Sequence, residues 1–173
     1  MMRRALTLIA ATAFVLSSTA GVFAQAKPNF SGKWVMDPSS APAPPAGGGG
    51  GGGRGGGRGG GAGFGQEFTV QQDATMLMIT RMQGDQSVMA MYKLDGSESK
   101  NTVNGRGGPQ EQVSKAMWDG AKLVITTQLN FGGNAIEQKQ TLSIEGGNLV
   151  VEQSRPGRDG GAPTVTKLVY KKG

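Results

Sequence analysis

From Glu67 to the C-terminus, apolar and polar residues alternate with a period of two, and glycine-containing turns interrupt the alternation. Successive side chains point to opposite faces of a β-strand, whereas a helix repeats every 3.6 residues. Residues 122–131 are the clearest case, because Leu123, Ile125 and Leu129 share one face. With an opening segment before them, these patterns predict an all-β chain of ten short strands, at 29–37, 67–72, 75–82, 86–94, 99–103, 112–118, 122–131, 135–144, 149–153 and 164–171.

The turns indicate how these strands connect. Asp95-Gly96 and Asp119-Gly120 are dipeptides that tight hairpins favour, and Gly146-Gly147-Asn148 makes another turn. Short strands joined in this way form an antiparallel meander. Closing a meander into a barrel pairs its edge strands. We therefore expect an up-and-down barrel of about 8–10 strands, with a β-sandwich as the alternative that periodicity does not separate from it.

The N-terminus has the pattern of a secretory signal. Met1-Met2-Arg3-Arg4 is basic, residues 6–22 are mostly apolar, and Val22-Phe23-Ala24 offers small residues for cleavage before Gln25. The pattern predicts a signal peptide at 1–24 and a periplasmic or secreted mature protein. No later apolar run is long enough for a membrane helix. The rest divides into a first strand at 25–40, a Pro/Gly-rich flexible loop at 41–65 and the remaining barrel at 66–173.

Composition excludes several chemistries. The chain has no cysteine and no histidine, so disulfides, thiolate nucleophiles, Ser-His-Asp triads and ordinary zinc sites are excluded. The formal charge is +6, and part of it would leave with Arg3 and Arg4, which is too little to indicate a nucleic-acid partner. The carboxylates are scattered, and a pair suited to glycoside hydrolysis would need the fold to bring two of them together. We predict no catalytic residue, no cofactor and no metal.

The glycine tract at 47–65 has no periodic apolar residues and is expected to be a flexible linker. Arg54 and Arg58 give it the look of an RGG tract, but two arginines neutralise few phosphates. A contact with an anionic envelope surface is the functional alternative.

The opening Asn29-Phe30-Ser31-Gly32-Lys33-Trp34, together with the Asp-Gly turns and the closing Leu168-Val169-Tyr170, resembles lipocalin-like (calycin) barrels. It looks closest to small secreted bacterial proteins that begin with Phe-Ser-Gly-x-Trp. The resemblance implies a barrel whose cargo is a small apolar molecule, with Gly32 and Trp34 as structural residues at one barrel end. Lipocalins place an arginine of the last strand over the tryptophan. This chain has Lys167, Lys171 and Lys172 there instead.

Methionines recur at alternate positions in two adjacent predicted strands: Met76, Met78 and Met82 in one, Met89 and Met91 in the next. Thioethers are soft ligands that select copper(I), which is one interpretation. The favoured interpretation is apolar lining, because methionine adapts to irregular spaces. We predict that Met76, Met78, Met89, Met91 and Met117 line the barrel lumen.

The favoured function is therefore an exported, monomeric, non-enzymatic barrel that buries a small apolar or amphipathic ligand in its lumen. The alternative is a cell-envelope interaction module with a packed barrel, whose glycine- and arginine-rich loop contacts anionic surfaces.

Overall fold

The computed structural model describes residues 26–41, 64–105, 108–131, 134–157 and 161–173. These residues form ten β-strands and one short 3-10 helix, so the all-β prediction is confirmed. None of them belongs to a helix with the length and hydropathy of a membrane span. The elements are β1 (Gly32–Met36), η1 (Pro38–Ser40), β2 (Glu67–Gln72), β3 (Met76–Gln83), β4 (Gln86–Lys93), β5 (Glu98–Gly105), β6 (Gly108–Asp119), β7 (Lys122–Phe131), β8 (Asn134–Glu145), β9 (Asn148–Arg155) and β10 (Thr164–Lys172).

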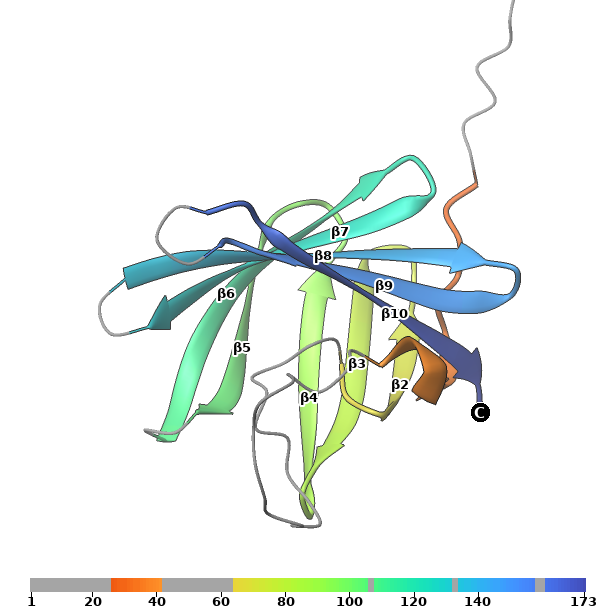
Figure 1. Cartoon of the computed structure of the whole chain (residues 1–173), viewed down its shortest axis with the longest axis horizontal. Coiled ribbons are helices and arrows are strands. Elements are labelled where there is room, and N and C mark those ends of the chain that lie inside the picture. Colours follow the sequence, from red (N-terminus) through yellow and green to blue (C-terminus); the bar gives the residue numbers. More distant parts are fainter. Residues whose placement is uncertain (1–25, 42–63, 106–107, 132–133, 158–160) are drawn as a thin grey trace, which may run out of the picture.

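The strands form one antiparallel sheet in the order β4-β3-β2-β1-β10-β9-β8-β7-β6-β5. The first and last strands meet, with Trp34 opposite Lys172. In Figure 1 the strands β2–β5 run across the direction of β7–β10, so the sheet curves round and faces itself. The predicted up-and-down barrel is confirmed, in a nearly closed form.

Side chains, rather than a strand ladder, join the two edge strands β4 and β5. The Asn101 side chain accepts from the Met91 N–H (2.7 Å) and donates to the Met91 carbonyl (3.0 Å). The Lys93 N–H donates to the Ser99 hydroxyl at 2.9 Å. Asn101 thus offers Met91 the donor and acceptor that a neighbouring backbone would supply.

This seam corrects the expectation that Asp95-Gly96 closes a paired hairpin. The turn exists, and Gly96 adopts a φ of +83° that glycine tolerates. Its N–H, however, donates to the carbonyl of Ala116 in β6 at 3.0 Å. The turn is therefore held against β6, and β4 and β5 separate without a ladder.

The β5–β6 hairpin is longer than predicted. The predicted strands at 99–103 and 112–118 exclude Gly108 and Pro109, but in the structure these two residues pair with Gly105 and Asn104. Proline is tolerated at the start of a strand, where one missing N–H costs little.

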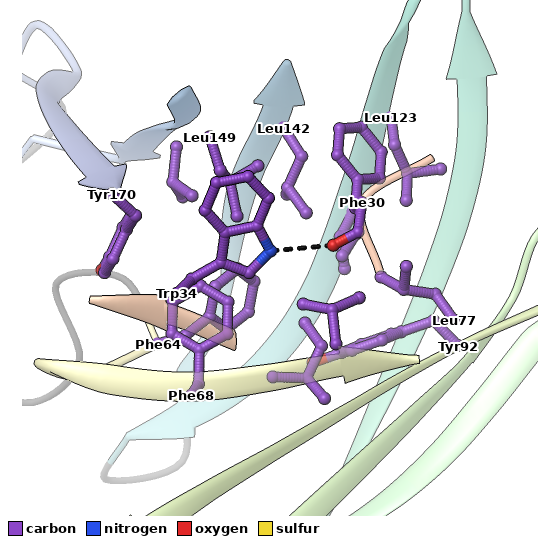
Figure 2. Close-up of a cluster of buried hydrophobic side chains, with 14 of the residues drawn as sticks. Phe30, Trp34, Phe64, Phe68, Leu77, Tyr92, Leu123, Leu142, Leu149 and Tyr170 are labelled. Carbon is purple, nitrogen blue, oxygen red and sulfur yellow. Dashed lines mark hydrogen bonds between the residues drawn. The ribbon is translucent and has the colours of Figure 1, made fainter. Parts of the chain in front are cut away.

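The inward side chains of one half of the barrel form a continuous apolar core, much of which Figure 2 shows. The Trp34 indole N–H donates to the Phe30 carbonyl at 2.8 Å, so this buried polar group is satisfied. Phe64 is 4 % exposed and packs against Phe68 at a ring distance of 5.1 Å. Phe64 falls in the glycine tract at 47–65, which was predicted to be a flexible linker, so this contact was not predicted. The core comprises Phe30, Trp34, Phe64, Phe68, Val70, Leu77, Ile79, Tyr92, Leu94, Ala116, Leu123, Ile125, Leu142, Leu149, Val151, Leu168 and Tyr170.

Candidate ligand-binding site

The inner wall changes character along the barrel. Near the β2–β3 and β6–β7 turns, inward residues such as Leu77 and Leu123 are fully buried. Toward the β3–β4 and β7–β8 turns, inward positions are only half-buried, which means that solvent reaches the inner wall from this side. We call this the open end and define it by Arg81, Val88, Val103, Gln112, Leu129, Ile136, Gln138 and Thr166.

A band of polar side chains lies between the apolar core and the open end. Its members face inward and are buried: Ser99, Asn101, Ser114, Thr127, Gln140 and Gln153. Ser114 and Thr127 are opposite each other on β6 and β7, and their hydroxyl oxygens are 2.8 Å apart. Gln140 lies opposite Gln153 on β8 and β9. No described residue hydrogen-bonds to the side-chain amide of Gln140, so the two N–H donors and the oxygen acceptor of this side chain are available to a ligand or to water.

Charge divides between the two faces of the wall. The strand glutamates alternate with the inward residues and so face outward: Glu67, Glu98, Glu111, Glu137, Glu145 and Glu152. Four of them form ion pairs with outward lysines, of which Lys33–Glu67 at 2.9 Å is an example. Arg81 and Arg155, by contrast, occupy inward positions near the open end. The inner face of the described strands therefore carries positive charge and no carboxylate.

Arg81 lies beside a group of aromatic side chains. It is opposite Phe68 in the β2–β3 ladder, and the Phe68 ring meets the Tyr170 ring edge-on at 4.9 Å. Burial raises the pKa of Tyr170 to about 12, and the nearby backbone of Phe64 and the charge of Arg81 oppose that rise. Burial also raises the pKa of Tyr92, again against the charge of Arg81.

Both polar groups beside Phe68 lack partners. The Tyr170 hydroxyl is buried and makes no hydrogen bond to any described residue. Arg81 likewise forms no ion pair within the described part of the chain. The Arg81 guanidinium is half-buried near the open end and provides charge-assisted hydrogen-bond donors that a buried anion requires, whereas the Tyr170 hydroxyl is enclosed in the core.

The methionines predicted to line the lumen face outward, so that placement is wrong. Met76, Met89, Met91 and Met117 are 36 to 58 % exposed. Met78 is half-buried and shares their outward phase, because its neighbours Leu77 and Ile79 point inward. A signal was present: the methionine positions share their phase with polar Thr80, Ser87 and Lys93, whereas the other phase carries leucine, isoleucine and tyrosine.

Gly32 and Trp34 occupy structural positions. Trp34 is 1 % exposed, and the Lys172 ammonium lies 5.7 Å from its ring centroid. A lysine thus contacts the indole where the resembled barrels use an arginine. Gly32 has a φ of +139°, and a Cβ there would lie 3.7 Å from Lys172 Cε. Closure of a barrel end by this pair stays a prediction.

A separate depression lies near the β2–β3 and β4–β5 turns. Its volume is about 460 Å³, and it is lined by Lys27, Ala74, Thr75, Met76, Lys93, Leu94 and Asp95. Most of these residues are exposed, so the depression offers little area for burying an apolar molecule. The predicted cleavage site, Arg54 and Arg58 lie outside the described residues.

Among the comparisons with known proteins, similarity is found to solved structures. No family model and no curated protein matches the chain. Among solved structures, the wild-type fluorescent protein UnaG is similar at a TM-score of 0.45 and 17 % identity, covering 62 % of this chain and 72 % of that one. Zebrafish ileal bile acid-binding protein complexed with cholic acid has a TM-score of 0.45 at 22 % identity, again covering 62 % and 72 %. Both scores are low, so the architecture rests on the chain's own strand pairing.

Proposed function

We propose that the protein is an exported, non-enzymatic carrier that binds an amphipathic anion in the open end of its barrel. The observation that carries this proposal is the inward position of Arg81 on a wall whose described glutamates all face outward. Burying a carboxylate is costly unless charge-assisted hydrogen bonds compensate it. The Arg81 guanidinium supplies such donors, and it forms no ion pair within the described part of the chain.

The apolar part of the ligand has a complementary surface. Val103, Leu129 and Ile136 are inward-facing and half-buried at the open end. Covering them removes apolar area from water, which contributes roughly 25 cal/mol per Å². The Gln140 amide adds an uncommitted polar group to the same wall. Export and the contact of Arg54 and Arg58 with an anionic surface belong to the proposal as predictions from the sequence.

The test compares two forms of one probe, a dansyl-labelled undecanoic acid and its methyl ester, by fluorescence titration of the full mature chain. We expect the acid to bind more tightly than the ester. Arg81→Gln should weaken binding of the acid about tenfold or more, since hydrogen bonds to charged groups contribute about 1.5–3 kcal/mol. It should leave ester binding unchanged.

Lys139→Gln is the matched control, because Lys139 is exposed on the outer side of β8 and its loss removes the same charge. Equal affinity for acid and ester, or equal weakening by both substitutions, would show that Arg81 does not hold the head group. If neither probe binds, the carrier proposal is wrong, and the interaction-module alternative gains support.

A further inference from the structure

Five methionines occupy the outer face of a single pair of strands. They are Met76, Met78 and Met82 on β3, with Met89 and Met91 on β4. Single exposed apolar residues are ordinary on a protein surface, but a group of exposed methionines on one face requires a physical explanation. Core packing does not explain the group, because these side chains point away from the core. Strand propensity does not explain it either, because strands favour β-branched and aromatic residues.

The register brings three of these thioethers together. Met78 lies directly opposite Met91 in the β3–β4 ladder. The Met91 N–H and carbonyl bond to Asn101, on the side away from β3, so Met78 and Met91 form a non-hydrogen-bonded pair. Such pairs have the closest side chains in an antiparallel sheet. Met89 is the diagonal neighbour of Met78, within reach of a long side chain.

The remaining two methionines have different surroundings. Met76 is the diagonal neighbour of Met91, but it lies directly opposite Lys93, whose ammonium opposes the approach of a cation. Met82 is opposite Ser87 at the far end of the hairpin, 64 % exposed, and is separated from Met78 along the strand by Thr80. The cluster of Met78, Met89 and Met91 is therefore distinct, and we call it the methionine cluster.

Sulfur is the chemical property that these three side chains share beyond their apolar bulk. Thioethers are uncharged, soft and weakly basic, and they favour soft monovalent ions over zinc or calcium. The chain has no cysteine and no histidine, so methionine is its only soft ligand. In the described residues no three His, Cys, Asp or Glu side chains gather where they could hold a harder metal ion.

We propose that the methionine cluster binds Cu(I), with Met78, Met89 and Met91 as its three thioether ligands. Binding forms three sulfur–copper bonds and moves no electron or proton. Since thioethers have no proton to lose, the affinity should not depend on pH near neutrality. The site lies on the outside of the barrel wall and is separate from the proposed lumen ligand.

The test is anaerobic titration of the full mature chain with Cu(I), in competition with a chromophoric Cu(I) chelator. We expect one Cu(I) per chain. A Met78→Leu/Met91→Leu variant should bind at least about tenfold more weakly, because even outer-shell changes at metal sites commonly cost 10–100-fold. Leucine nearly conserves the volume, so the fold should persist, and circular dichroism will verify this.

The matched control is Met82→Leu/Met117→Leu, which removes two exposed methionines outside the cluster. Its Cu(I) affinity should equal that of the wild type. In a parallel Ag(I) titration, the methyl resonances of Met78, Met89 and Met91 should shift and that of Met82 should not. Equal weakening in both double variants, an unselective shift of all methionines, or displacement of Cu(I) by equimolar Zn(II) would overturn the proposal. Binding of the dansyl acid should be unchanged in both variants, which separates this site from the lumen.

Discussion

Asn101 gives the sharpest test of how the barrel closes. Its side chain is 7 % exposed and forms two hydrogen bonds with the backbone of Met91, at 2.7 and 3.0 Å. Asn101→Ala removes both partners and leaves an N–H and a carbonyl of β4 unpaired at the seam. Each buried polar group left without a partner costs about 1–3 kcal/mol. Because the Met91 side chain is exposed, water reaches part of this edge, and we take about 1–1.5 kcal/mol for each of the two groups, the low end of that range.

The expected loss is therefore about 2–3 kcal/mol in the free energy of unfolding, measured by urea denaturation. For a domain of this size it corresponds to a fall in Tm of roughly 6–12 °C. Hydrogen exchange should localise the effect, with faster exchange of the Met91 amide. The amides of β9 and β10, which lie in the middle of the sheet, should keep their protection relative to global unfolding.

Thr102→Ala is the control, since Thr102 is the next residue of β5 and is exposed. It should change stability by less than about 0.5 kcal/mol. If the two variants are equally stable, or if Met91 exchange is unchanged in Asn101→Ala, the side-chain seam does not hold β4 to β5.

Two further predictions concern stability. Trp34→Ala should cost about 3–5 kcal/mol by urea denaturation, because it empties a fully buried site and removes the bond to Phe30. Met89→Leu, on the exposed face, is the control and should cost less than about 1.5 kcal/mol. A loss as small as this for Trp34→Ala would contradict the prediction. Asp37 should titrate at a pKa of about 2 in carboxyl-detected NMR, because Lys171 Nζ lies 2.8 Å from its carboxylate and Ser39 also bonds to it. Its folded pKa lies below its ordinary value of 3.8, so its contribution to stability is complete above pH 3.8 and is lost as the pH falls through about 2. Lys171→Met should raise that pKa, and an unchanged value would show that Lys171 is not its cause.

The strands were predictable because alternation and glycine turns are local properties of the chain. The inward phase of β3 was not read correctly, since Met76-Leu77-Met78-Ile79 is apolar at every position. The first polar residues of the strand are Thr80, which faces outward, and Arg81, which faces inward. Because a charged residue is normally expected to face outward, Arg81 favours the wrong phase for β3. The charge of Arg81 thus concealed the side of the strand on which it lies.

The seam was beyond sequence reasoning for another reason. Asp95-Gly96 is a genuine turn, but the Gly96 N–H donates to the carbonyl of Ala116 in β6, a contact with no signal in the local sequence. Ser99 and Asn101 appear in the sequence as weak strand formers, whereas in the structure they replace backbone partners. Such substitution of side chain for backbone has no periodic signature.

The ladder between β1 and β10 has a consequence for the order of assembly. All other ladders join strands that are consecutive in the chain, and except for β1–β2 the connecting loops are short. The β1–β10 ladder instead pairs the first strand with the last, with Trp34 opposite Lys172. The chain therefore cannot complete its barrel until its last strand is free. A circular permutant beginning at β5 and ending at β4, with residue 173 linked to residue 26, would convert this closure into a local hairpin. Because β4 and β5 share no ladder, opening the chain at the Asp95-Gly96 turn cuts no strand pairing. The lower contact order of the permuted chain should make it fold faster than the natural one.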